Sequence, residues 1–384
     1  MSYLSIIQKN NDKISFLSRL KLYNRARLER RMINNIIKTN IPNRNKRHRP
    51  NKITNFLFIE IQEGWGDFVY FLGLLKALHS AGLTIDVVSL PNTYQRYFNL
   101  PFVRNAYSIS DQDLAAKISK NNYDIAFDIT YVNDKRWDLR RKLLANLNCY
   151  TITAGNITAH SNLFDSFIDL GKAAHWQDRN TIIFDYIIQP ITSIGPIPPT
   201  YIDNAPQSHI KSYLNNLDKE SNYIYVNTIT RSPDRSLSES QVQELIKLFN
   251  ERKKSVGIFY TSINFQETEF VKKPPKMSFN DLISIIKNCK AIISPDTSVV
   301  HLGSIYNIPV LGFYCGNFRD YWTKYPQANA WAPISQMSDI FYEDDPNTDE
   351  TSDFIYTHKK KIVSSYPTIK IKSLADQFLS KLGL

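Results

Sequence analysis

The sequence predicts an α/β protein with two domains in series, each an open parallel sheet covered by helices. Two observations carry this prediction. From residue 53 onward, strand-like and helix-like segments alternate along the chain, and the alternation is interrupted by one proline-rich stretch before it begins again. The length of 384 residues fits two domains of ordinary size.

The first run of alternating segments begins with the apolar strand ITNFLFIEI. The helix-like FVYFLGLLKALHSAG ends at Gly82 and is followed by the strand TIDVVSL, and a later strand, YDIAFDIT at residues 123–130, follows the helix-like DQDLAAKISKN. Strands that alternate with helices in this way are typical of a parallel sheet. We therefore expect an N-terminal Rossmann-like domain over residues 53–195.

The stretch QPITSIGPIPPTYID, residues 189–203, is rich in proline and lacks a helical period, so it predicts an interdomain linker. Beyond it the strands NYIYVNTI, SVGIFYTS, KAIISP and IPVLGFYC alternate with three helix-like segments. This pattern predicts a second Rossmann-like domain over residues 204–384. Because such sheets bind ligands at the carboxyl ends of their strands, we expect the binding site in a cleft between the domains.

The net charge of +11 is concentrated at the N-terminus. Residues 1–50 hold 13 Lys and Arg but 2 Asp and Glu, which leaves 34 of each for the rest of the chain. We expect residues 1–52 to be a basic amphipathic helical extension with a linker. Such a segment is suited to an anionic membrane surface, although a solvated extension and a helix packed on a partner domain fit as well. The neutral body argues against nucleic acid as a partner.

Cysteine and histidine usage indicates neither a disulfide framework nor a metal site. Cys149, Cys289 and Cys315 are scattered, which favours a reducing compartment, and the seven histidines lack metal-ligand spacing. We therefore expect no metal and no cofactor. The longest apolar runs are about seven or eight residues, far short of the roughly 20 that span a bilayer, and the N-terminus lacks a signal-peptide pattern.

The sharpest local motif is AIISPDTSVVHLGSIYNIPVLGFYCGN, residues 291–317. A strand ends at about Ser294, and Asp296, Thr297 and Ser298 then open a helix, whose N-terminus suits a phosphate group. His301 lies one turn beyond Ser298. The following strand ends near Gly316, where a glycine lets backbone approach a ligand closely. An ordinary capped helix with a buried histidine is the competing interpretation.

A second motif, QEGWGDFV, follows the first strand of the N-terminal domain. Gly64 and Gly66 allow a tight turn and close approach by a substrate, and Asp67 stands at the start of the next helix. The third glycine of a dinucleotide-binding fingerprint is missing. Asp67 is either a general base or a helix N-cap, and the two roles can coexist. Trp65 is either a platform for a sugar or a hydrophobic plug.

These motifs, in this order, resemble glycosyltransferase family 9, the ADP-heptose:lipopolysaccharide heptosyltransferases. The stretch DTSVVHLGSIYNIPVLGFY is similar to the C-terminal signature of the family, and FLFIEIQEGWGDFVYFLGLLKAL, YDIAFDI and YVNTITRSPDRSLSESQVQELIKLF resemble three further segments. The likeness covers roughly residues 53–335. Ser298 stands where the family has glycine, and Gly303-Ser304-Ile305 replaces its run of small residues, which puts the identity of the donor in doubt more than the fold.

The resemblance implies a GT-B fold and a transfer of sugar from a nucleotide donor to a lipid-linked saccharide, with inversion and without a metal. It implies that Asp67 is the base and that Asp296, Thr297, Ser298 and His301 lie near the donor. Such chemistry needs a base for the attacking hydroxyl and positive charge beside the departing diphosphate. Arg231 and Arg235, in TITRSPDRS, are the candidate phosphate clamps, and the sequence leaves the choice between them open.

We therefore expect an inverting glycosyltransferase that builds a bacterial surface saccharide, such as lipopolysaccharide or lipooligosaccharide. Its substrates would be a nucleotide-sugar, with ADP-heptose as one candidate, and a lipid-linked saccharide acceptor. The expected location is cytoplasmic, with peripheral contact to the inner face of the inner membrane through residues 1–50. The alternatives are a sugar-nucleotide epimerase of related fold and a non-enzymatic protein that binds nucleotides or nucleic acid.

Overall fold

The structure of the chain is a computed structural model that describes residues 47–61, 64–129, 137–154, 163–170, 175–189, 197–198, 200, 206–218, 220–316, 331–343 and 362–384. These residues form two compact units. The first unit holds the described residues up to Ile61 together with Ile85–Phe98 and Arg104–Ile168. The second holds those within Gln62–Thr84, Asn99–Val103 and Asp169–Leu384.

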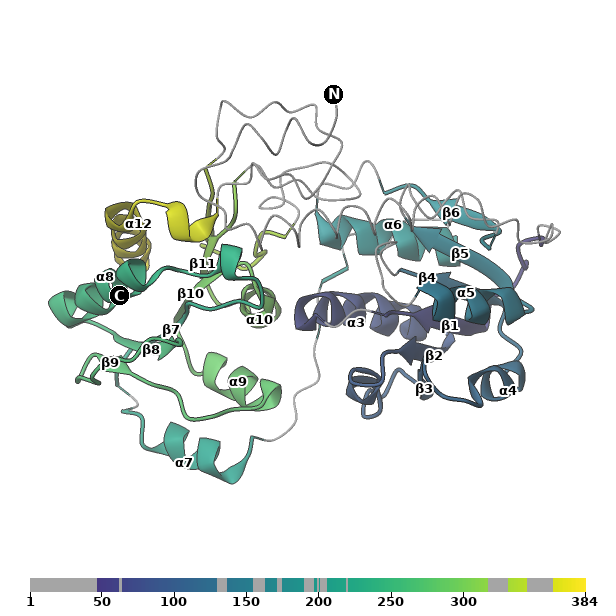
Figure 1. Ribbon diagram of the computed structural model, residues 1–384, viewed down its shortest axis with the longest axis horizontal. Helices are drawn as coiled ribbons and strands as arrows, with labels where there is room; N and C mark the ends of the chain where they lie inside the picture. Colours follow the sequence, from purple (N-terminus) through teal and green to yellow (C-terminus); the bar gives the residue numbers. More distant parts are fainter. Residues whose placement is uncertain are drawn as a thin grey trace, which may run out of the picture. The chain divides into compact units, whose positions relative to one another are not determined.

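The first unit contains a six-stranded sheet in the order β3-β2-β1-β4-β5-β6 (Figure 1). Its strands are β1 (Asn55–Ile59), β2 (Thr84–Ser89), β3 (Asn105–Ser108), β4 (Ile125–Asp128), β5 (Tyr150–Ala154) and β6 (Ser166–Ile168). Its helical segments are η1 (Tyr94–Tyr97), α4 (Leu114–Ser119) and α5 (Trp137–Asn146). The pairs β2–β3, β1–β4, β4–β5 and β5–β6 are parallel.

The core of the first unit follows from alternation along β1. Leu57 and Ile59 lie in one buried cluster with Leu114 and Ile118 of α4 and Leu144 of α5. The intervening side chains of β1 point to the opposite face, where Phe58 contacts Phe127 of β4 with 6.0 Å between ring centroids. Because both faces of this parallel sheet are buried, its strands are nearly continuous apolar runs.

The second unit contains another six-stranded sheet, ordered β12-β11-β10-β7-β8-β9. Its strands, all paired in parallel, are β7 (Tyr223–Asn227), β8 (Val256–Tyr260), β9 (Val271–Lys272), β10 (Ala291–Pro295), β11 (Val310–Phe313) and β12 (Asp339–Phe341). Its helical segments are α3 (Trp65–Ser80), α6 (Trp176–Ile188), α7 (Ser208–Asn215), η3 (Pro233–Arg235), α8 (Glu239–Arg252), α9 (Phe279–Ile286), α10 (Ser298–Tyr306), η4 (Val363–Ser365) and α12 (Thr368–Lys381).

Helices cover both faces of the second sheet. Ile224 and Val226 of β7 face a cluster shared with α8 and α12, which lie side by side in Figure 1. Tyr223 and Tyr225 point the other way, into a cluster shared with α7, α9 and α10. In both sheets the strand order reverses direction at the first strand, so β1–β4 and β7–β10 are the switch points where such sheets bind ligands.

Helix α3 packs against α6 and α10 within the second unit, although it follows β1 in the chain. The Asn180 side-chain amide donates a hydrogen bond of 3.0 Å to the backbone oxygen of Tyr70. A methyl group on Gly73 would stand 2.3 Å from the backbone oxygen of Pro198, so only a glycine permits this approach. The packing brings the first turn of α3 to the ligand-binding end of the second sheet.

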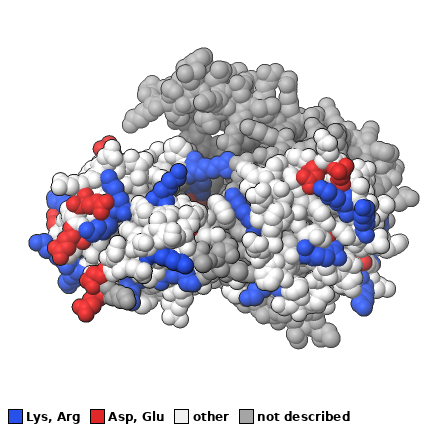
Figure 2. Space-filling model, turned by 90° about the horizontal axis from the view of Figure 1, so that it is seen from below, with Lys and Arg blue, Asp and Glu red and all other residues white. Residues whose placement is uncertain are grey.

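The predicted fold class, two parallel α/β sheets, is confirmed. The domain bounds at residues 53–195 and 204–384 stay a prediction, and the predicted helical extension over residues 1–52 lies almost entirely outside the described residues. On the face seen in Figure 2, Lys and Arg side chains stand in small groups with uncharged surface between them. Among the described residues, no helix is both long and apolar enough to cross a membrane.

Candidate active site at the switch point of the second sheet

A buried polar network marks the carboxyl ends of β7 and β10. The Asn227 side-chain amide donates to the hydroxyls of Ser294, at 3.1 Å, and Thr297, at 3.2 Å. Thr297 is the N-cap of α10, and its hydroxyl accepts a bond of 3.3 Å from the Val299 amide. Thr297 and Ser298 are half-buried, so the start of α10 is partly exposed to solvent here.

Asp296 pairs with Arg235 at this helix terminus. The Arg235 Nη1 atom donates to Asp296 Oδ2 at 3.0 Å; the Asp296 side chain is 7% exposed and that of Arg235 is 31% exposed. The Asp296 charge raises the pKa of Arg235 further above its ordinary value. Arg231 lies outside η3 and is exposed. Arg235 is thus the arginine that the fold joins to Asp296.

The loop that carries Arg235 is closed by a serine hydroxyl and tied to the end of β7 by a backbone hydrogen bond. The Thr230 amide donates to Ser236 Oγ at 2.9 Å, and the Leu237 amide donates to the Thr228 backbone oxygen at 2.9 Å. Pro233 begins η3, where its fixed φ and missing N–H suit a helical start. The local chain therefore holds Arg235 near the carboxyl end of β7.

Asp67 is the third residue of α3, and the N-cap is Gly64. The alternative interpretation of Asp67 as the helix N-cap is therefore wrong, because the N-cap lies three residues earlier, at Gly64. A Cβ atom on Gly64 would stand 2.6 Å from Asp67 Oδ2, so the carboxylate folds back over the bare Gly64 backbone. Gly64 thus leaves the space that the carboxylate occupies.

The Asp67 side chain is half-buried, and its carboxyl is difficult to ionise. Burial chiefly raises its pKa to about 6, the Asp296 charge adds to this effect, and Arg235 opposes it. The two carboxylates and the guanidinium therefore form one electrostatic group within the second unit. A carboxyl group with this pKa is poised to accept a proton near neutral pH.

His301 lies beneath the first turn of α3. A Cβ atom on Gly66 would stand 3.1 Å from His301 Cδ2 and 3.2 Å from Nε2. The His301 ring is also packed against Tyr70, at 4.4 Å between centroids, and Trp331, at 5.5 Å. Burial lowers its pKa to about 3, so the imidazole is neutral at physiological pH. Among the described residues, His301 Nδ1 has no hydrogen-bond partner.

The structure brings together Asp67, Arg235, Asp296, Thr297 and His301 from the predicted set. Gly64 and Gly66 flank them, Ser298 begins α10, and Gly316 is buried shortly after β11. Their functional roles stay predictions. Among the described residues, no group of three or more His, Cys, Asp or Glu side chains is placed to hold a metal ion.

Other residues at the site were missed by the sequence reasoning. Asn227 could have been found, because it ends the first strand of the second domain beside the switch point. Tyr70 and Trp331 could not, since the sequence does not show that they pack on the same histidine. His175 has a structural contact: its Nε2 atom lies 3.0 Å from the Ala332 backbone oxygen.

Comparison with known proteins agrees with the motifs. Residues 234–347 match the model of glycosyltransferase family 9 (heptosyltransferase). This confirms the family resemblance for the segment that carries Arg235, Asp296, Thr297 and His301. No curated protein matches the chain.

Several solved structures have the same fold. The glycosyl transferase family 9 protein from Veillonella parvula DSM 2008 is similar with a TM-score of 0.64 and 13% identity, over 85% of this chain and 98% of that one. The E. coli ADP-heptose lipopolysaccharide heptosyltransferase II gives 0.57 and 15%, over 86% and 100%. The E. coli heptosyltransferase WaaC with ADP gives 0.54 and 16%, over 85% and 100%. These matches support the GT-B assignment of the two sheets.

Proposed function

We propose that this chain is an inverting glycosyltransferase that moves a sugar from a nucleotide donor to a lipid-linked saccharide. The observation that carries the proposal is the grouping of Asp67, Asp296 and Arg235 beside the N-terminus of α10. The match of residues 234–347 to glycosyltransferase family 9 supports the same reaction class.

Asp67 is the proposed general base. In an inverting transfer the acceptor hydroxyl attacks the anomeric carbon, the bond from that carbon to the diphosphate breaks, and a base takes the hydroxyl proton. With a pKa of about 6, Asp67 is mostly ionised at pH 7 yet more basic than an ordinary aspartate. The bare Gly64 backbone beside it leaves room for the carboxylate itself.

Arg235 and the start of α10 are proposed to hold the leaving diphosphate. The guanidinium and the positive end of the α10 dipole both favour negative charge, which develops on the diphosphate as it departs. Asp296 orients Arg235 through the 3.0 Å ion pair. Since these groups can supply the required charge, we propose that transfer needs neither a metal ion nor another cofactor.

The donor and acceptor are proposed from the similar proteins. ADP-heptose is the first donor to test, because one protein of the same fold is an ADP-heptose lipopolysaccharide heptosyltransferase and another is a heptosyltransferase with ADP. A saccharide of the lipopolysaccharide type is the corresponding acceptor. An acceptor of this kind would place the enzyme at the inner face of the bacterial inner membrane, with the basic residues 1–50 toward its anionic lipids.

The test begins with thermal unfolding in the presence of ADP, UDP, GDP or CMP, because a ligand that binds the native state stabilises it. Transfer is then measured with the matching nucleotide-sugar, with and without acceptor. We expect Asp67→Ala to abolish transfer while nucleotide-dependent stabilisation persists. Undiminished turnover in Asp67→Ala would refute the base, and conversion of the donor to an isomeric sugar without acceptor would indicate an epimerase.

A further inference from the structure

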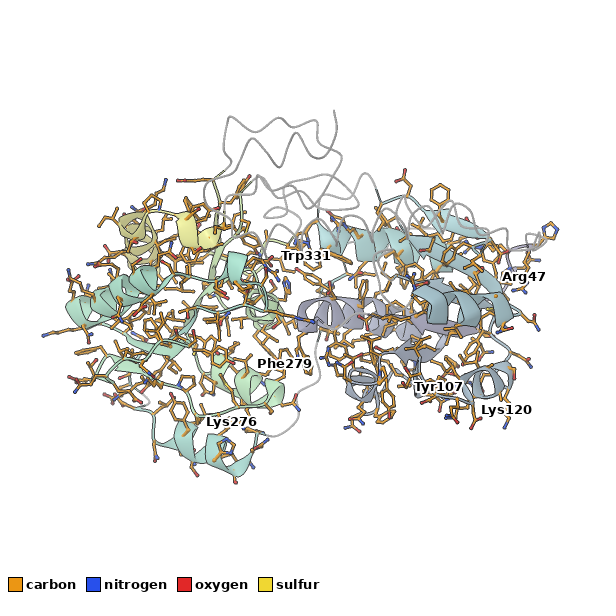
Figure 3. The ribbon with its side chains drawn as sticks, viewed as in Figure 1. Arg47, Tyr107, Lys120, Lys276, Phe279 and Trp331 are labelled. Atoms are coloured by element: carbon orange, nitrogen blue, oxygen red, sulfur yellow. The ribbon has the colours of Figure 1, made fainter. Side chains whose placement is uncertain are left out.

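Trp65, the first residue of α3, makes a contact that the proposed reaction does not explain. Its ring stacks on that of Phe279, with centroids 3.8 Å apart and planes inclined by 14°. Its edge also meets Phe68 one turn later, at 5.6 Å and 88°. Figure 3 labels Phe279 at the start of α9. The stack therefore joins the first residue of α3 to the first residue of α9.

The two helices differ in how their first turns are held. Gly64, the N-cap of α3, has no side chain and so makes no side-chain cap. Helix α9 has a complete capping box, in which Ser278 and Asp281 exchange bonds of 3.3 and 2.9 Å. Asp281 Oδ1 also accepts a bond of 2.9 Å from the Gln207 amide. Phe279 thus stands on a fixed turn, whereas Trp65 stands on one without a side-chain cap.

The first turn of α3, whose N-cap residue lacks a side chain, carries the proposed base. Two rings of the second unit contact the residues just before Asp67: the Phe279 ring contacts Trp65, and the His301 ring lies against Gly66. Helix ends fray more readily than helix interiors. The Trp65–Phe279 stack can restrain this turn, since an aromatic pair contributes more stability than its buried area alone would give.

We propose that Trp65 is a positioning residue whose stack on Phe279 holds the first turn of α3, and with it the Asp67 carboxylate, in place for proton transfer. This inference rests on the proposed role of Asp67. It assigns Trp65 a restraint rather than sugar binding, because its ring is engaged by both Phe279 and Phe68.

The test compares Trp65→Ala, Trp65→Phe, Phe279→Ala and the double variant Trp65→Ala/Phe279→Ala. We expect Trp65→Ala and Phe279→Ala each to lower kcat about 10- to 100-fold, with donor KM within about 3-fold of the wild type, because a small displacement of a reacting group is costly. The double variant should be no slower than the slower single variant, since both remove one contact. Trp65→Phe should recover most of the activity.

A pH profile separates positioning from general loss of structure. Freeing the turn admits water to Asp67, so the acid limb of kcat in Trp65→Ala should move to lower pH. Asp296 and Arg235, whose charges act on Asp67, are unchanged in these variants, as are His301, which lies against Gly66, and Tyr70, which packs on His301. Tyr306→Ala is the matched control: it removes an aromatic ring at the far end of α10, in contact with Lys287, and should lower the melting temperature without changing kcat.

Each outcome has a distinct meaning. An active wild type whose Trp65→Ala variant keeps full kcat would overturn this inference and leave the proposed function standing. A rise in acceptor KM at unchanged kcat would overturn it in favour of a sugar platform. Independent, multiplicative effects of the two single variants would show that the stack is not the relevant contact. A wild type that transfers no sugar from any donor would instead refute the proposed function.

Discussion

The guanidinium of Arg235 lies 3.0 Å from the Asp296 carboxylate and acts on the charge of Asp67 as well. One cation therefore attracts two carboxylates at the proposed site. Asp296 holds the direct bond, and Asp67 is left with a raised pKa because burial and the Asp296 charge outweigh the attraction of Arg235. A change at Arg235 should therefore affect both donor binding and the base.

Replacement of Arg235 by Ala should lower kcat/KM by about 10²- to 10³-fold, the usual cost of losing a group that stabilises the departing charge. The stabilisation by the cognate nucleoside diphosphate should fall as well. Arg231→Ala is the control, because its side chain is exposed and lies outside η3. Steady-state kinetics of both variants decide between the two arginines. A larger loss in Arg231→Ala would transfer the clamp role to Arg231.

The rate of transfer should fall in acid as Asp67 is protonated. With a pKa of about 6, the base is lost below pH 6, and kcat/KM should drop about tenfold for each further pH unit. Asp296→Asn removes the neighbouring charge that raises this pKa, so its acid limb should lie at lower pH than that of the wild type. Profiles recorded from pH 4.5 to 8 test both statements. An acid limb that stays in place in Asp296→Asn would argue against the coupling.

Much of the fold could be predicted because it is determined locally in the sequence. The helix after Asp296-Thr297 forms where the sequence predicts it, since a good capping residue, Thr297, follows a buried strand. The strand itself ends at Pro295 rather than Ser294, within the usual error for an element boundary. The alternation of Tyr223 and Tyr225 with Ile224 and Val226 likewise fixes which faces of β7 meet which helices.

The arrangement of the site was harder to predict from the sequence. Aspartate is a common N-cap, so local preference favours Asp67 over Gly64, yet Gly64 takes that position and leaves space for the carboxylate. The stack of Trp65 on Phe279 depends on α3 joining the second unit, which chain order does not reveal. Contacts between residues far apart in the sequence carry no local signal.

Gly64→Ala should impair the enzyme without unfolding it. The backbone of Gly64, at φ −68° and ψ 136°, is one that alanine adopts freely, but the added methyl group would meet Asp67 Oδ2 at 2.6 Å and displace the carboxylate. We expect kcat to fall about 10²-fold with donor KM little changed.

Gly82→Ala, beyond the other end of α3, is the matched control for this variant. Gly82 has a φ of +93° with open space around it, so alanine there should reduce stability and leave kcat unchanged. Measurements on both variants should show a lower kcat in Gly64→Ala and a lower melting temperature with normal kcat in Gly82→Ala. Normal kcat in Gly64→Ala would mean that the carboxylate position seen here is not the catalytic one.

Asp67→Asn should stabilise the protein above pH 6 while it removes activity. The folded-state pKa of about 6 lies above the ordinary value of 3.8, so the folded protein binds this proton more tightly than the unfolded chain. The stabilisation that this bound proton gives the folded state is fully present below about pH 4 and is lost as pH rises through 6. Asparagine does not ionise, so the variant avoids this loss. At pH 8 its melting temperature should therefore be a few degrees above that of the wild type.

Comparison of the two pH values makes this prediction specific. At pH 4 the wild-type carboxyl is largely protonated in the folded state, so the two proteins should melt at nearly the same temperature. Asp218→Asn gives the opposite sign, because bonds from the Glu220 amide and Ser221 hydroxyl lower the pKa of Asp218, and its loss should destabilise the protein at pH 8. If Asp67→Asn gained equally at pH 4 and pH 8, the gain would not come from ionisation, and the raised pKa on which the base assignment depends would be wrong.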